Sequence, residues 1–202
     1  HQSLLEHAKA RLFTKSGQSL CDYVLERQTA ILVRPTLWAV LSYLREADPG
    51  KYREELDRFM GADLRLHVRY LLIDFLSQVN LPEDFEVLHM TDRLKAGNDP
   101  LRVLIAIRGK EQWFRAFSDA VFPMVMSWKP QDQWPMVGVI SEAWKFARDE
   151  CLRLVERYWL PDSEKDALTW QSLREIKQWD QRSVDMICKV IRRAGGGEDR
   201  LW

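Results

Sequence analysis

Apolar residues recur along this chain at the spacing of an α-helix. Leu37, Val40, Leu41 and Leu44 follow an i, i+3, i+4, i+7 pattern, which places them on one face of a helix. The stretch "LRLHVRYLLIDFLSQ", residues 64–78, continues the same pattern. Alternating β-branched runs bounded by turns, which are typical of strands, do not recur. The pattern therefore predicts an all-α protein.

Turn-forming residues divide the pattern into short helices. Asp48-Pro49-Gly50 and Asn80-Leu81-Pro82 are examples, because Pro and Gly interrupt helical periodicity. The longest predicted helix is expected to kink near Pro135 or to be broken once more. The predicted helices span residues 2–15, 19–29, 35–47, 50–60, 64–79, 82–96, 99–108, 110–127, 132–159, 164–179 and 181–194.

The predicted helices pair into hairpins that begin at regular intervals. First helices begin near residues 34, 64, 99, 132 and 163, a period of about 30–35 residues that is typical of α-solenoids. The stretches "LRLHVRYLLIDFLSQ" and "DPLRVLIAIRG" also resemble HEAT-type repeats. We therefore expect an α-α superhelix of HEAT-like helical hairpins over residues 31–194. Linking helices at 1–30 would precede it and a flexible tail at 195–202 would follow it; a compact helical bundle is the alternative.

Charge and composition narrow the class of partner. The 202 residues include 30 basic and 30 acidic side chains, so the formal net charge is zero. Nucleic-acid binders usually carry a basic excess, so a protein is the favoured partner and nucleic acid the less favoured one. Three widely spaced cysteines predict reduced thiols and a cytoplasmic location. Apolar runs are shorter than the roughly 20 residues of a membrane span, so no membrane partner is expected.

The sequence contains no recognised catalytic motif. A phosphate-binding loop, a GxGxxG fingerprint, an HExxH helix and a GxSxG elbow are all absent. None of the four histidines pairs with another at i+3 or i+4, the spacing of a helical metal site. We therefore expect no catalytic residue, no metal and no cofactor.

Partner binding is expected to depend on exposed arginine and tryptophan side chains, the usual anchors of protein interfaces. Arg65, Arg69 and Arg102 lie near the starts of first helices in successive hairpins, and Trp113 and Trp134 lie near turns. These five are the predicted partner-binding residues. Core packing is the alternative for both tryptophans.

HEAT-like alkylpurine DNA glycosylases provide an enzymatic alternative. These proteins are all-helical and use tryptophan and carboxylate side chains on a basic concave surface. Trp113 with Asp119, or Trp144 with Glu142, would be the matching pairs here. The zero net charge argues against this alternative.

The amino-terminal segment "HQSLLEHAKARLF" resembles a motif of STAND-type NTPases, the NACHT and related signalling ATPases. The positions that fit the motif are His1, Gln2, Leu4, Glu6, Ala10 and Arg11. His7 departs from it, because the family has an aromatic residue there. Residues 19–60 resemble the helical arm that follows this motif in bacterial members.

This resemblance implies a role in a larger protein. In STAND NTPases the carboxyl-terminal repeats bind a target, after which the ATPase oligomerises and switches on an effector. The chain, which begins without Met, would then be a sensor arm that has no nucleotide site of its own. Any oligomer would form through the parent protein. Many bacterial members of this family act in antiviral defence, so the resemblance suggests that process.

Overall fold

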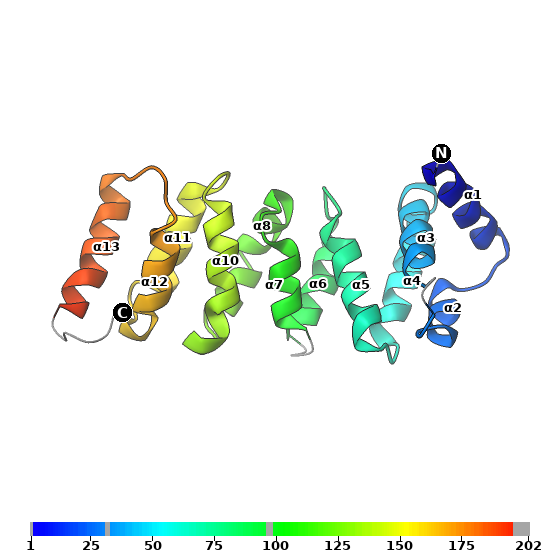
Figure 1. Cartoon of the computed structure of the whole chain (residues 1–202), viewed down its shortest axis with the longest axis horizontal. Coiled ribbons are helices and arrows are strands. Elements are labelled where there is room, and N and C mark those ends of the chain that lie inside the picture. The colour runs from blue at the N-terminus through cyan, green and yellow to red at the C-terminus, as the bar shows by residue number, and fades with distance from the viewer. Residues whose placement is uncertain (1, 31–32, 96–98, 196–202) are drawn as a thin grey trace. The chain divides into compact units, whose positions relative to one another are not determined.

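The computed structural model of the chain describes residues 2–30, 33–95 and 99–195 (Figure 1). These residues form 13 α-helices and no strand, which confirms the all-α prediction. Internal contacts divide the chain into unit 1, residues 1–78, and unit 2, residues 79–202. His1, residue 96 and all of the predicted tail except Gly195 lie outside the described residues. The predicted division at residues 30 and 31 stays a prediction.

Unit 1 is organised around one central helix. Its described helices are α1 Gln2–Lys15, α2 Leu20–Glu26, α3 Val33–Ala47, α4 Pro49–Gly61 and α5 Leu66–Ser77. Helix α3 packs against the other four. The predicted stripe of Leu37, Val40, Leu41 and Leu44 is at most 1% exposed, so the helical periodicity identified the core face correctly.

A buried carboxylate holds the short helix α2 in place. Glu55 of α4 accepts hydrogen bonds from the hydroxyl of Ser19 (3.1 Å) and the backbone N–H of Cys21 (2.8 Å). Ser19 in turn caps α2 by accepting from the N–H of Asp22. The negative charge thus lies at the amino-terminal end of a helix, where the helix dipole favours it. A seven-residue helix that is marginal alone gains a tertiary partner.

Unit 2 contains the remaining helices. They are α6 Asp84–Lys95, α7 Pro100–Ile107, α8 Glu111–Ser118, α9 Val121–Val125, α10 Trp134–Ala143, α11 Arg148–Tyr158, α12 Asp166–Leu173 and α13 Gln181–Ala194, with 3-10 turns η1 Pro130–Gln133 and η2 Ser163–Lys165. Helix α10 packs against α7, α8, α11 and α12, and α12 packs against α13 (Figure 1). No helix in the described part of the chain is both long and apolar enough to cross a bilayer.

Two long predicted helices are broken in the structure. The predicted 132–159 helix is divided by a turn at residues 144–147, and the predicted 110–127 helix by residues 119–120. At the first break, the indole Nε1 of Trp144 donates to the carbonyl of Ser172 on α12 (2.9 Å). Pro135 lies in the first turn of α10, where its missing N–H costs nothing. Tertiary contacts rather than proline therefore set the main break.

A polar cluster lies in the core of unit 2. The ammonium group of Lys165 donates to the carbonyls of Met126 (2.9 Å) and Tyr158 (3.4 Å), at the ends of α9 and α11. The fully buried Gln133 accepts from the indole Nε1 of Trp159 and donates to the carbonyl of Trp128. The last carbonyls of a helix have no partner within the helix, and here side chains satisfy them.

Candidate functional site

A groove of about 570 Å³ opens in unit 2. It lies where the end of α7 meets the face of α10 and the segment that follows α12. The floor comes largely from Val137, Gly138 and Ser141 of α10 and from Trp144, the residue that follows this helix. These residues follow the 3.6-residue repeat, so they share one face of the helix.

A glycine in α10 lets an arginine lie against the helix backbone. A Cβ on Gly138 would be 3.3 Å from both Cζ and Nε of Arg108, closer than an ordinary van der Waals contact. Arg108 follows α7, and Gly109 then adopts φ +74°, a conformation that glycine takes without strain. Glycine inside a helix costs about 1 kcal/mol relative to alanine, so this close approach gives Gly138 a structural role.

The rim of the groove carries charges of both signs. The cations are Arg108, Lys145, Arg148 and Lys177. The carboxylates are Glu142 and Glu175. Glu142 lies between two of the cations, with an ion pair to Lys145 and a 3.7 Å contact to Arg108. The hydrogen bond from Lys145 holds the pKa of Glu142 below its usual range. The carboxylate is therefore ionised at neutral pH, and the rim is mixed in charge with a basic excess.

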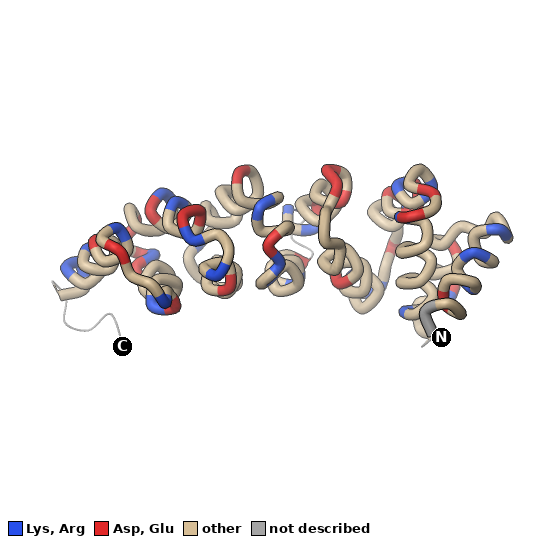
Figure 2. The backbone as a smooth tube through the Cα atoms, turned by 90° about the horizontal axis from the view of Figure 1, so that it is seen from above, with Lys and Arg blue, Asp and Glu red and all other residues tan. Residues whose placement is uncertain are grey.

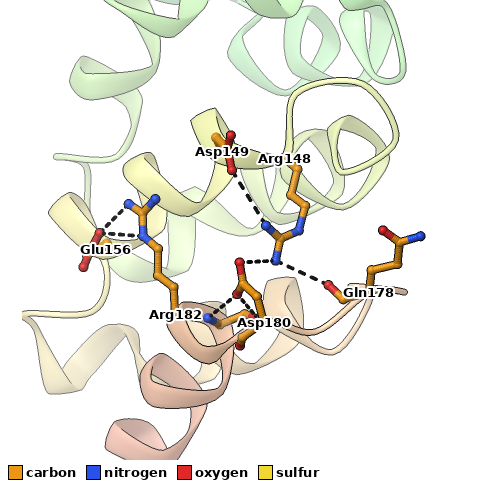
Figure 3. A network of polar contacts seen from close by, with 7 residues as sticks. Arg148, Asp149, Glu156, Gln178, Asp180 and Arg182 are labelled. Atoms are coloured by element: carbon orange, nitrogen blue, oxygen red, sulfur yellow. Dashed lines mark hydrogen bonds and ion pairs between the residues drawn. The ribbon is translucent and has the colours of Figure 1, made fainter.

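Arg148, the first residue of α11, fixes one wall of the groove (Figure 3). Its Nη2 donates to Asp180 Oδ2 (2.9 Å) and to the carbonyl of Gln178 (3.3 Å). Arg182 and Glu156 form a second link between α13 and α11, through Nη2 (2.6 Å) and Nε (3.2 Å). The first link ties the segment between α12 and α13 to α11, and the second ties α13 itself to α11. The guanidinium of Arg148 is therefore held in one geometry before any ligand binds.

The pKa of Asp180 is lowered to about 2. The backbone N–H of Ser183 contributes most by donating to the carboxylate (2.9 Å); the Ser183 hydroxyl and Arg148 act in the same direction. Because the pKa in the folded state is below the value of about 3.9 for an unfolded chain, the ionised carboxylate stabilises the fold above about pH 4. That contribution is lost as pH falls from about 4 to about 2.

The Asp180→Asn variant should therefore differ from wild type in a pH-dependent way. Asparagine keeps a side-chain oxygen that caps α13, so the substitution removes mainly the charge. We expect the variant to be less stable than wild type at neutral pH, with the difference shrinking between about pH 4 and about pH 2. Urea unfolding at a series of pH values measures it. A stability difference that is the same at pH 7 and at the acid end would contradict this assignment.

The structure distributes the five predicted partner-binding residues over both units. Arg65 and Arg69 are in unit 1, where Arg65 is exposed and Arg69 donates to the carbonyl of Leu64 (3.1 Å). In unit 2, Arg102 is half-buried and Trp134 is 49% exposed, whereas Trp113 is fully buried against Phe117. Trp113 offers no surface to a partner, because its indole is part of the core.

None of these five residues lines the groove. Arg108, Lys145 and Arg148 were missed because each looks in the sequence like an ordinary charge beside a helix end. Gly138 was the available signal: a lone glycine within an apolar helical stretch often marks a close approach of another group.

Comparison with known proteins adds no family. No protein-family model, no curated protein and no solved structure matches this chain. The resemblance of the amino-terminal segment to STAND NTPases therefore stays a prediction; the described part of that segment lies in α1.

Three of the four side chains in the glycosylase alternative, Asp119, Trp144 and Glu142, have structural partners, and Trp113 is buried in the core. Asp119 pairs with Arg153 (3.0 Å), and Trp144 and Glu142 both line the groove but are held by the contacts given above. Burial raises the pKa of Cys21 to about 11 and raises that of Cys151 further, so neither thiol ionises near neutral pH. Within the described residues, no group of three or more His, Cys, Asp or Glu side chains could hold a metal ion.

Proposed function

We propose that this chain is a non-catalytic helical-repeat scaffold that recognises a protein partner through the groove of unit 2. The observation that carries the proposal is the mixed charge of the groove rim above a floor that includes Val137 and Trp144. A protein surface that binds nucleic acid presents a continuous basic strip, because neutralisation of the phosphates dominates the binding affinity. In Figure 2, by contrast, acidic and basic positions are interspersed along the helices.

The groove has the features of a site for a protein segment that carries carboxylates. Arg148 is held by Asp180, so this cation loses little freedom on binding, and Arg108 lies beside Gly138. Arginine pairs with carboxylates through two parallel hydrogen bonds, which gives geometric selectivity. Val137 and Trp144 supply apolar contact between the charges.

The wider architecture and context in this proposal come from the sequence. The helical hairpins would stack as a HEAT-like superhelix, and the chain would be the sensor arm of a larger signalling NTPase. Hairpin packing such as that of α3 with α4 and of α12 with α13 supports the first part. The second part rests on the amino-terminal resemblance, and the encoding reading frame tests it: a phosphate-loop NTPase core is expected upstream of His1.

A displayed library of random peptides tests the groove. Peptides selected on the wild-type chain are expected to be acidic and to lose about tenfold or more in affinity, about 1.4 kcal/mol, for the variants Arg108→Glu and Gly138→Leu. The leucine would fill the floor and displace the guanidinium of Arg108. Gly61→Leu is the matched control, because a side chain there meets open space at the end of α4.

Two results would contradict the proposal. One is a set of selected peptides that bind wild type and both groove variants equally well. The other is saturable binding to a short DNA duplex with a steep loss of affinity as salt rises. The second result would favour the alternative, a HEAT-like nucleic-acid-binding protein or alkylpurine DNA glycosylase.

A further inference from the structure

The rest of unit 2 covers only part of the apolar surface of helix α13. Its buried residues are Ser183, Met186 and Val190. Beside them, Val184 is 37% exposed and Ile191 is 47% exposed, and Ile187 and Cys188 between them are half-buried. These four residues, which we call the α13 face, follow i, i+3, i+4, i+7 spacing, the pattern of a helix surface that packs against another helix.

Charged residues of opposite sign lie toward opposite ends of one edge of the α13 face. Asp185 and Arg192 are seven residues apart, so they lie along the same edge of the face, and both are exposed. The acidic residue is in the amino-terminal half of the helix and the basic residue is in the carboxyl-terminal half. In an antiparallel pair the same edges of the two copies adjoin, which brings Asp185 close to Arg192 of the second copy. In a symmetric parallel pair the two copies of this edge lie on opposite sides of the contact, so these opposite charges do not meet.

We propose that the α13 face binds a second copy of this chain, with the two α13 helices antiparallel. The two-fold axis passes between Ile187 and Cys188, the middle of the stripe, so that Val184 meets Ile191 of the second copy. The contact is isologous, and each Asp185–Arg192 pair therefore occurs twice. A single helix pair buries less than a standard interface, so the dimer is weak and depends on concentration. This dimer is separate from the peptide-binding groove of α7 and α10.

Cys188 makes the arrangement directly measurable. Antiparallel helices pack at about 8–10 Å between axes, which places the two Cys188 thiols beside the two-fold axis within reach of a short bismaleimide. Cys21 and Cys151 are buried, so Cys188 is the accessible thiol among the three. We expect a covalent dimer of twice the 23.9 kDa chain, formed in proportion to protein concentration and absent from Cys188→Ser.

A pair of matched variants tests the apolar contact. Ile191→Glu is expected to weaken dimerisation by tenfold or more in sedimentation velocity. Ile105→Glu on α7 is the control, because Ile105 is an exposed isoleucine (51%) of the same unit that lies away from the α13 face. Equal dimerisation by the two variants would overturn the proposal.

A charge exchange tests the antiparallel register. Asp185→Arg alone should reduce cross-linking through Cys188, because it places two pairs of like charges together. Asp185→Arg combined with Arg192→Asp should restore cross-linking, because the opposite charges meet again in reversed order. A double variant no better than the single one would refute this register.

Other occupants of the α13 face give different results. A chain that stays monomeric at high concentration leaves the face to a different partner and overturns the proposal. Species larger than a dimer, without cross-linking of Cys188 to Cys188, would indicate head-to-tail contact with another surface and would also overturn it. Peptide binding by the groove does not require the dimer, so Ile191→Glu should retain it, and the two proposals can fail separately.

Discussion

Replacing Lys165 by methionine is expected to lower the free energy of unfolding of unit 2 by about 2–4 kcal/mol. Methionine fills a similar volume but cannot donate to the carbonyls of Met126 and Tyr158, which would stay desolvated without their partner. Urea unfolding followed by tryptophan fluorescence measures the loss, because eight of the nine tryptophans lie in unit 2.

Lys177→Met is the control for this substitution. Lys177 is exposed, so removing its charge should change the free energy of unfolding by no more than about 0.5 kcal/mol. If the two variants unfold at the same urea concentration, Lys165 does not hold the ends of α9 and α11 in the way the structure indicates.

Two tryptophan-to-phenylalanine substitutions are expected to differ strongly although both remove the same atoms from the core. Trp159 and Trp113 are both fully buried. The indole N–H of Trp159 donates to Gln133, whereas that of Trp113 has no hydrogen-bond partner among the described residues. Trp159→Phe should therefore cost about 1–3 kcal/mol more than Trp113→Phe, because it leaves the buried amide oxygen of Gln133 unpaired.

Circular dichroism at the helical band measures both variants, since fluorescence itself changes when a tryptophan is removed. The smaller ring leaves a similar space in each case, so the difference between the two variants isolates the hydrogen bond. A greater loss for Trp113→Phe than for Trp159→Phe would show that packing around each ring outweighs the hydrogen bond.

Helical periodicity was sufficient to predict the fold class and much of the core. The stripe of α3 and the proline-led starts of α4 and α7 are local features, because spacing and capping act within a few residues. The position of the break at residues 144–147 was not predictable in this way. Neither glycine nor proline is present there, and the contact that anchors it joins Trp144 to Ser172, 28 residues away.

The candidate site could be predicted less well than the fold. The groove depends on Arg108 lying against Gly138, a contact between residues of different helical hairpins that no spacing rule contains. Periodicity also did not separate the two predicted tryptophans: Trp113 is fully buried and Trp134 is 49% exposed, although both lie near turns. An amphipathic side chain at a helix end packs inward or outward according to its tertiary neighbours.

The carboxylate that anchors α2 also bears on the order in which unit 1 folds. Glu55 and Cys21 are 34 residues apart, so their hydrogen bond forms only after the intervening chain has closed. A seven-residue helix does not persist alone in water. We therefore expect the α3–α4 hairpin, made of adjacent segments, to form first and α2 to pack onto α4 late in folding.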